Sequence, residues 1–324
     1  MPLGLAPYIS PMTLITAPTG IDWETIPPGD SVTPAENEAE WWNICNRATA
    51  KVDGYINQTL RATIDTELLH GPDYYVTCGP AAGGNTPTPY STWGGSNARI
   101  ILSRWPILQV LNVQTCPNNQ WPRVWRAVTP GFFEPEQPPI GLYGSVAPGP
   151  TAQGGQAILV APGWVDWTFG RNGWAIQVQY INGWPHAELT ANATAGSNTI
   201  TVNDTTGWAL TEYVGGFTGA TGVIKDSGQQ EAIHVATSST TSGPGTLTLS
   251  ANLVYPHEMG TIVSTLPASI EQACILFATA EALNRGATST TIHSVGGHAQ
   301  MTGGDVEALA SEAELLCHPY KRVI

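Results

Sequence analysis

The segment from 267 to 285 constrains the fold of this chain more than any other. Pro267 opens it, Gly286 follows it, and nearly every residue from Ala273 to Ala280 is apolar or small. Proline is favoured at the start of a helix and glycine just past its end. A helix that is apolar on every side must be buried on every side. The segment therefore predicts a helix in the centre of a bundle or in a contact between subunits. The residues expected in a subunit contact are Ile270, Cys274 and Phe277.

Two more segments predict helices, each with one apolar stripe. In 33–63 the sequence Thr33-Pro34-Ala35-Glu36 forms a capping box, and apolar residues recur every three or four positions after it. The other segment opens at Thr302-Gly303-Gly304-Asp305 and stops at His318-Pro319, because proline cannot continue a helix. An apolar stripe has to pack against another element, so the three helices predict a helical bundle.

Strand patterns fill the chain between the first helix and the other two. They occur near 99–114, 121–128 and 156–160, and most clearly at 175–181, where apolar residues alternate with glutamines. Short strands separated by glycine-containing turns continue through 187–265, which is typical of a small β-barrel or sandwich. The predicted fold class is α+β: a helical bundle, made of the N-terminal helix and two C-terminal helices, with a β-strand excursion and an inserted small β-barrel or sandwich module.

We expect three parts along the chain. Residues 1–32 are rich in proline and glycine without periodicity, and they predict an extended N-terminal arm. Residues 33–186 and 266–324 form a core of helical bundle plus strands. Residues 187–265 form the inserted β module.

The composition narrows the classes of function. Charged residues are 11% of the 324 residues, against about 25% in an average protein, and the net charge is −13. Binding to nucleic acid needs Lys and Arg to displace counterions, so an ordinary nucleic-acid-binding protein is not expected. A surface with few charges suits a protein packed against neighbours, and also an extracellular carbohydrate-binding protein. The sequence has no run of about 18 apolar residues and no positively charged leader, so we expect neither a membrane span nor a secretory signal.

No pattern of residues predicts catalysis, a cofactor or a metal site. The sequence contains no P-loop and no His-Glu-x-x-His motif. His293 and His298 lie in a polar stretch without a carboxylate pattern, and we interpret the stretch as a loop between helices. Pro256-His257-Glu258 is interpreted as a turn of the β module. Three cysteines within helical patterns are interpreted as small buried residues: Cys45, Cys274 and Cys317.

A carbohydrate-binding or carbohydrate-cleaving protein is the alternative. Asp22 with Glu24, and Glu134 with Glu136, could serve as the acid and base of a glycosidase, but proline-rich segments support such a pair poorly. Many tryptophans fall in the β and loop regions, where they could stack on sugars. We favour the interpretation that they fill the core and interfaces. They are Trp93, Trp105, Trp121, Trp125, Trp164, Trp167, Trp174, Trp184 and Trp208.

The order of several segments carries a family resemblance. The helix at 33–63 is followed by strands near 99–114 and 174–181, then by Asn182-Gly183-Trp184-Pro185, and finally by two helices from Leu266 onward. The amino-acid sequence is most similar in two runs, Leu266-Pro267-Ala268-Ser269-Ile270-Glu271-Gln272-Ala273 and Leu315-Leu316-Cys317-His318-Pro319-Tyr320-Lys321-Arg322. Over somewhat less than half of its length, the chain resembles the head-to-tail connector (adaptor, or head completion) proteins of tailed bacteriophages. The module at 187–265 resembles small β inserts of phage structural proteins.

The resemblance implies a structural virion protein of the neck, assembled in the host cytoplasm. Such proteins form a homo-oligomeric ring, usually a dodecamer, that joins the portal of the capsid to the neck or tail and continues the channel for DNA ejection. The implied partners are the portal protein, the next neck or tail-completion protein and other copies of the chain. DNA passes through without sequence-specific binding, and no membrane, cofactor or metal takes part.

The C-terminal segment of such proteins commonly reaches the portal. The corresponding residues here combine an aromatic ring, two positive charges and an apolar tip. The residues expected in the portal contact are Tyr320, Lys321, Arg322, Val323 and Ile324.

Overall fold

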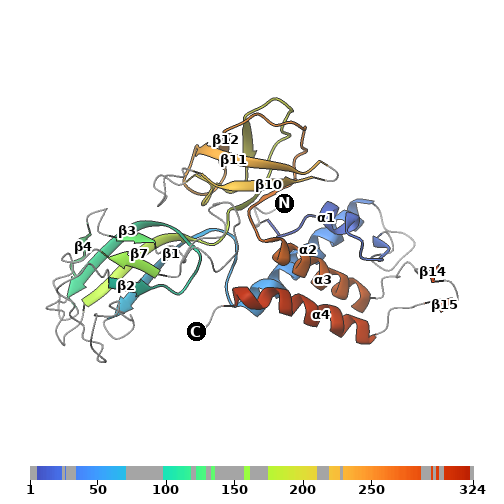
Figure 1. Cartoon of the computed structure of the whole chain (residues 1–324), viewed down its shortest axis with the longest axis horizontal. Coiled ribbons are helices and arrows are strands. Elements are labelled where there is room, and N and C mark those ends of the chain that lie inside the picture. The colour runs from blue at the N-terminus through green and yellow to red at the C-terminus, as the bar shows by residue number, and fades with distance from the viewer. Residues whose placement is uncertain are drawn as a thin grey trace, which may run out of the picture. The chain divides into compact units, whose positions relative to one another are not determined.

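The computed structural model of the chain divides into two compact units (Figure 1). The residues that the structure describes are 6–23, 26, 34–70, 98–117, 122–128, 133–135, 157–160, 174–209, 219–226, 229–285, 293–294, 297–298 and 303–321. Unit 1 comprises Met1–Leu60, Pro185–Thr205 and Gly222–Val323. Unit 2 comprises Arg61–Trp184 and Thr206–Thr221, together with Ile324.

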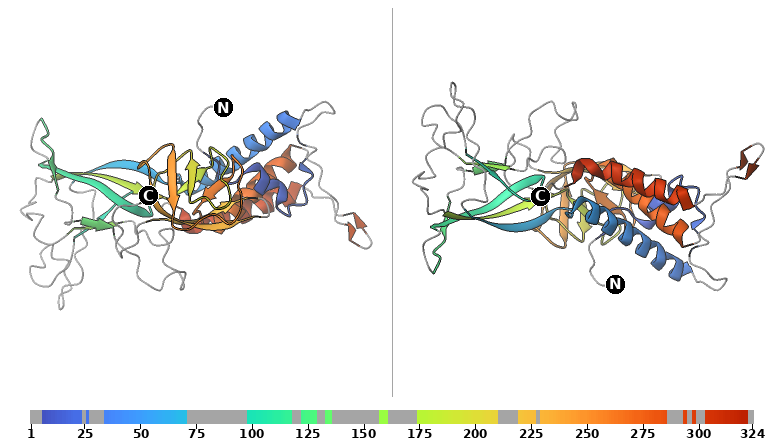
Figure 2. Two further views of the ribbon diagram at one scale, coloured as in Figure 1. Left: turned by 90° about the horizontal axis from the view of Figure 1, so that it is seen from above. Right: turned by 90° about the horizontal axis from the view of Figure 1, so that it is seen from below.

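Helix α3 of unit 1 packs against two of the other helices of that unit. The α-helices are α1 (Pro11–Thr16), α2 (Pro34–Ile56), α3 (Ala268–Asn284) and α4 (Gly303–Cys317), and a short 3-10 helix, His318–Tyr320, follows α4. Both α2 and α4 pack against α3, and the right-hand view of Figure 2 shows the three side by side. Nine residues of α3 are buried, including Ile270, Cys274 and Phe277, as expected for a helix that is apolar all round.

Helix α2 is shorter than the sequence predicted. It ends at Ile56, and the next residue, Asn57, has a positive φ of 62°. Asparagine tolerates this left-handed conformation better than other residues with a side chain, and it is a common helix terminator. The predicted continuation of the helix to 63 is therefore wrong, and strand β1 (Thr63–His70) begins where that helix was expected to end.

The rest of unit 1 is a curled six-stranded sheet. Its strands are β8 (His186–Glu188), β9 (Thr199–Val202), β10 (Thr221–Lys225), β11 (Glu231–Ser238), β12 (Gly245–Leu249) and β13 (Ile262–Ser264). The order is β8-β13-β10-β11-β12-β9, and the outermost strands meet, because Asn203 N donates to Glu188 O at 3.0 Å and Thr190 N to Thr201 O at 3.0 Å. The inward-facing side chains are aliphatic, among them Ile200, Val202, Ile224, Val235, Leu247 and Ile262.

Unit 2 contains antiparallel sheets. One has the order β1-β7-β3-β4, where β7 is Trp174–Asn182, β3 is Ile107–Pro117 and β4 is Arg126–Ala127. The other has the order β2-β6-β5, from Ala98–Ile101, Ala157–Val160 and Phe133–Pro135. In β7, Ile176, Val178 and Tyr180 are buried while Gln179 is exposed, which is the alternation that the sequence predicted.

The prediction of an extended arm over 1–32 is wrong for residues 6–23. Ser10 caps α1 by accepting a hydrogen bond from Thr13 N at 3.1 Å, and Pro11 occupies the first turn. Tyr8, Ile9 and Leu14 are buried, and Tyr8 N donates to Thr49 Oγ1 on α2 at 2.9 Å. The segment is ordered because these three apolar side chains find a surface on the rest of unit 1. The signal in the sequence was the pair Ser10-Pro11, which is a helix start.

The α+β class is confirmed. The described part of the chain holds only four α-helices, and the structure does not confirm a helical bundle as its overall class. The division of the remaining chain into a core and an inserted module stays a prediction, and the two compact units group these residues differently.

The fold leads to a prediction about two glycines. A Cβ at Gly245 would lie 2.6 Å from Thr240 Oγ1, 2.7 Å from Ser239 Oγ and 2.9 Å from Thr205 Cγ2. We expect Gly245→Ala to lower the free energy of unfolding by about 1–3 kcal/mol, because these neighbours must move. Gly54, in α2, has no atom within 4 Å of such a Cβ, so Gly54→Ala should raise stability by about 0.5–1 kcal/mol. Urea unfolding of both variants would measure this, and equal effects at the two positions would contradict the packing described for β12.

Candidate functional site

The first two residues of the segment expected to contact the portal, Tyr320 and Lys321, are held on unit 1. Tyr320 Oη shares a hydrogen bond of 3.0 Å with Ser269 Oγ, and Gln58 Nε2 donates to Tyr320 O at 3.2 Å. The Lys321 ammonium lies 4.6 Å from the centre of the Tyr55 ring, which is cation–π geometry. Tyr320 and Lys321 thus bind their own chain. Arg322, Val323 and Ile324 lie outside the described residues.

The predicted subunit contact is wrong. Ile270 and Cys274 are fully buried and Phe277 is 5% exposed within the single chain, so they offer no surface to a neighbour. The all-round apolar pattern of the helix was interpreted correctly as complete burial. The partners are α2 and α4 of the same chain, since apolar periodicity reports burial and does not identify which chain supplies the cover.

The cysteines of the helices are buried and free. Cys45, Cys274 and Cys317 are all inaccessible, as the sequence predicted. Burial raises the pKa of Cys45 to about 12 and that of Cys317 to about 11. The thiolate is the nucleophilic form of cysteine, so these thiols are unreactive at neutral pH.

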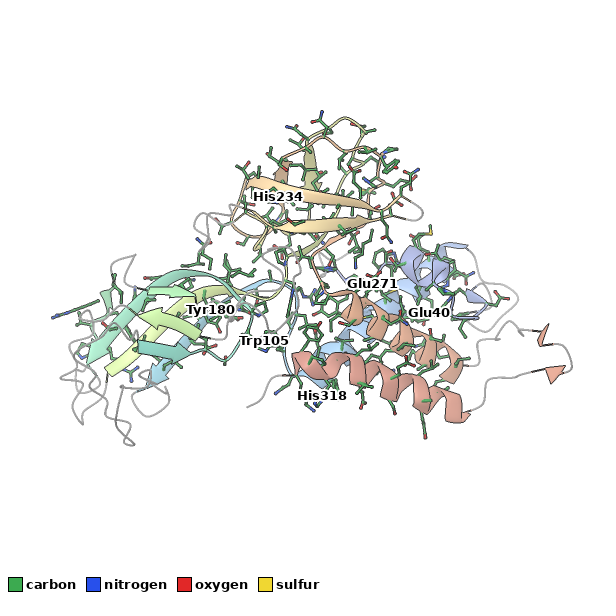
Figure 3. All side chains as sticks on the ribbon, in the orientation of Figure 1. Glu40, Trp105, Tyr180, His234, Glu271 and His318 are labelled. Carbon is green, nitrogen blue, oxygen red and sulfur yellow. The ribbon has the colours of Figure 1, made fainter. Side chains whose placement is uncertain are left out.

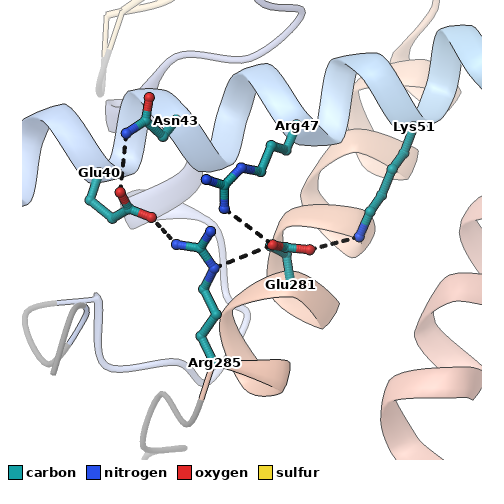
Figure 4. A network of polar contacts seen from close by, with 6 residues as sticks. All are labelled: Glu40, Asn43, Arg47, Lys51, Glu281 and Arg285. Carbon is teal, nitrogen blue, oxygen red and sulfur yellow. Dashed lines mark hydrogen bonds and ion pairs between the residues drawn. The ribbon is translucent and has the colours of Figure 1, made fainter.

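An ionic network joins α2 to α3 (Figure 4). Its members are Glu40, Asn43, Arg47, Lys51, Glu281 and Arg285. Glu281 accepts from Lys51 Nζ at 2.9 Å, from Arg285 Nε at 3.2 Å and from Arg47 Nη1 at 3.4 Å. The bond from Lys51 lowers the pKa of Glu281, although burial opposes the shift. This network fixes two helices whose contact residues are more than 200 positions apart in the sequence.

The connection between β12 and β13 presents apolar side chains on a fixed backbone. We name residues 254–259 the 254–259 loop. Val254 is 66% exposed, Met259 65% and Tyr255 43%. Glu231 accepts from Val254 N at 2.7 Å and from Tyr255 N at 3.2 Å.

A buried histidine completes the attachment of this loop. The His257 ring has no exposed side-chain surface and lies between two carboxylates, with Nδ1 3.2 Å from Asp226 Oδ2 and Nε2 3.3 Å from Glu231 Oε2. Asn192 Oδ1 accepts from Met259 N at 2.8 Å. Burial favours a higher pKa for Glu231, but the two backbone donors and His257 outweigh it and the pKa is lowered. The sequence analysis predicted a turn of the β module at Pro256-His257-Glu258, and these residues lie in this connection. The apolar surface around them was not predicted.

In unit 2 a carboxylate on β1 accepts hydrogen bonds from one other strand and from one connection. Both oxygens of Glu67 accept from Ser103 N, at 2.9 and 3.0 Å, and Oε1 also accepts from Ser103 Oγ and Tyr180 Oη. Tyr180, labelled in Figure 3, is buried, and burial together with Glu67 raises its pKa above the ordinary range. Arg104 Nε lies 3.3 Å from Asp65 on the same strand. These contacts attach the connection before β3 to β1, and sequence reasoning missed them because the partners are distant along the chain.

The carboxylate pairs of the carbohydrate alternative are only partly described. Asp22 is described and Glu24 is not. Glu134 belongs to strand β5, its side chain is not described, and Glu136 lies outside the described residues. Each pair therefore lies in part outside the described residues, and both pairs remain an interpretation of the sequence.

The two histidines near 295 are neighbours across a short hairpin. His293 pairs in register with His298 on strands β14 (His293–Ser294) and β15 (Gly297–His298). Among the described residues, no group of three or more His, Cys, Asp or Glu side chains is arranged to hold a metal ion.

Two of the tryptophans proposed for sugar stacking fill the interior. Trp184 and Trp208 are buried, and Trp105 packs edge-on against Trp184 with ring centres 5.6 Å apart. The core interpretation is confirmed for Trp184 and Trp208. Trp93, Trp121, Trp164 and Trp167 lie outside the described residues.

Comparison with known proteins identifies no relative. No protein-family model matches the chain, and neither a curated protein nor a solved structure does. Among the helices that the structure describes, none is long and apolar enough to cross a membrane.

The α2–α3 network leads to a pH-dependent prediction. Because the pKa of Glu281 is lowered by folding, its contribution is complete above the ordinary value of 4.5 and is lost as the pH falls through the folded value. We expect Glu281→Gln to lose about 0.5–1 kcal/mol at pH 7, since its partners are partly exposed, and to match the unmodified protein in strong acid. Urea unfolding across pH measures this. Glu312→Gln, on the exposed face of α4, is the control and should change little.

The 254–259 loop leads to a prediction about its rigidity. Glu231→Ala removes the acceptor for Val254 N and Tyr255 N, so we expect their amide hydrogen exchange to accelerate by about tenfold or more. Glu258→Ala removes an exposed carboxylate from the same loop and should leave both rates unchanged. Unchanged protection in Glu231→Ala would mean that the carboxylate does not hold the loop.

Proposed function

We propose that the protein is a structural component of a bacteriophage particle, a connector that forms a ring between the portal and the neck or tail. The observation that carries the proposal is that the two C-terminal helices, α3 and α4, contact the first long helix of the chain, α2. The pair α3 and α4, and the turn at His318–Tyr320, pack around α2 in the segment order on which the family resemblance rests. We also propose that α2, α3 and α4 act as one helical bundle that carries the β module.

The charge of the protein supports a passive DNA channel. The net charge is −13, and charged residues are only 11% of the chain. Like charge discourages adhesion of DNA to the wall of a channel. A ring of such subunits would pass DNA without sequence-specific binding and would be assembled in the host cytoplasm before it becomes part of the virion neck.

The proposed portal contact is the segment 322–324. Tyr320 and Lys321 are engaged with Ser269 and Tyr55, so their role is to position the residues that follow. Arg322, Val323 and Ile324 supply one positive charge and two apolar side chains. This pairing suits a contact that is selected by charge and held by apolar burial.

Deletion of 322–324 tests this contact in the phage that encodes the protein. We expect folded protein, and capsids that package DNA but neither retain it nor acquire tails. Purified portal should bind the intact chain in sedimentation and negative-stain images, and bind the truncated chain at least about tenfold more weakly. Glu312→Gln, which keeps 322–324 and the contacts of Tyr320 and changes only an exposed carboxylate of α4, is the matched control.

Two outcomes would count against the proposal. Normal yields of tailed, infectious particles after the deletion would show that 322–324 is not the contact. An intact chain that fails to bind portal, and instead binds a sugar on a glycan array, would replace the connector function with carbohydrate recognition.

A further inference from the structure

The 254–259 loop exposes side chains of the kinds found in protein interfaces, and its backbone is fixed by hydrogen bonds. It exposes Val254, Tyr255 and Met259 beside the exposed carboxylate of Glu258. Tyrosine and methionine are enriched in the centres of protein interfaces. The hydrogen bonds from Glu231 and Asn192 already fix the backbone, so binding there loses little conformational entropy.

The surroundings of this loop are acidic. Residues 226–284 contain no Lys or Arg. Asp226 and Glu231 lie directly beneath the loop, at the buried His257. The nearest basic residue in the sequence before this range, Lys225, forms an ion pair with Glu271 of α3. A partner of the loop therefore needs apolar side chains together with positive charge.

Unit 2 carries a segment of that chemistry. We name residues 123–126, Arg123-Val124-Trp125-Arg126, the basic strip. Val124 is 51% exposed and Arg126 is exposed, and no acidic residue occurs from 117 to 132. Its last residue lies in β4, an edge strand of the four-stranded sheet, where Arg126 pairs with Thr115. Arginine and tryptophan are, with tyrosine, the residues that most often dominate binding energy.

We propose that the 254–259 loop of one copy binds the basic strip of a second copy. The two surfaces are complementary in charge, and each adds exposed apolar side chains that water would otherwise cover. Because loop and strip are different surfaces, the contact is head-to-tail, which builds a ring when it closes. The biological role of this contact rests on the proposed connector function. Whether the contact exists can be tested on the purified chain alone.

Two variants with opposite defects test the contact. One is Arg123→Gln with Arg126→Gln, which removes the charge of the strip and leaves the loop intact. The other is Glu258→Lys with Met259→Lys, which reverses the loop and leaves the strip intact. Sedimentation velocity at low salt, up to about 1 mM protein, measures self-association of each full-length variant, of their mixture and of the unmodified chain.

We expect the unmodified chain to associate, each variant alone to associate at least about tenfold more weakly, and the mixture to form a 1:1 dimer. The mixture stops at a dimer because it contains one intact loop and one intact strip. The control is Glu312→Lys with Leu315→Lys on α4, which changes an exposed glutamate and a leucine that is 72% exposed and should not alter association. Unchanged circular dichroism and unfolding midpoints establish that the variants are folded.

The inference is overturned if the unmodified chain stays monomeric at about 1 mM, if the α4 control weakens association equally, or if the mixture forms no dimer. If the contact between loop and strip is refuted but the chain still binds portal, the proposed connector function is unaffected. A confirmed contact in a chain that does not bind portal would refute the connector function and leave the contact standing.

Discussion

The burial of α3 is the constraint on which the rest of unit 1 depends. A helix with apolar or small residues on every side has no stable position in water, so it requires cover along its whole circumference. Helices α2 and α4 supply cover along its length. At its start, β13 leads almost directly into α3, and the Lys225–Glu271 ion pair joins β10 to its first turn. The curled sheet and the helices are thus joined both by the short connection from β13 to α3 and by this ion pair.

The N-terminal segment is attached near the same region. The ring of His186 lies 2.9 Å from Ser264 Oγ at the end of β13 and 2.8 Å from Pro7 O, and Tyr8 packs edge-on against it at 5.7 Å. Tyr8 Oη accepts from Leu60 N at 2.8 Å, just beyond α2. A buried imidazole is tolerated here because both of its nitrogens have partners. Segments near 8, 60, 186 and 264 therefore converge, and residues 6–10 are part of the interior.

A chain with few charges uses several of its carboxylates as internal attachments. Glu67, Glu231 and Glu281 each accept hydrogen bonds from two or more groups that are remote in sequence. One ionised carboxylate with several donors holds a separate segment better than isolated neutral bonds would. Because charged residues are only 11% of the chain, few charges remain for the exposed surface, which suits repeated contact with neighbours.

The sequence was most informative where a pattern is local. The all-round apolar pattern of 267–285 located α3 and its burial, and alternation located β7. Local patterns failed at Asn57, where one left-handed residue ends α2, and at residues 6–23, which lack periodicity and are nevertheless buried. In both cases the conformation depends on what the rest of the chain offers to the segment, and a single window of sequence does not contain that information.

By itself, the sequence determined the α+β class, the buried helix and the charge-poor composition, because each follows from residue type and spacing. Only the tertiary structure decided that Ile270, Cys274 and Phe277 face their own chain, that Tyr320 and Lys321 are occupied by α2 and α3, and that the 254–259 loop is exposed on a fixed backbone. Burial, occupancy and exposure depend on contacts between residues that are far apart in the sequence, and spacing along one segment cannot specify which distant segment will cover it.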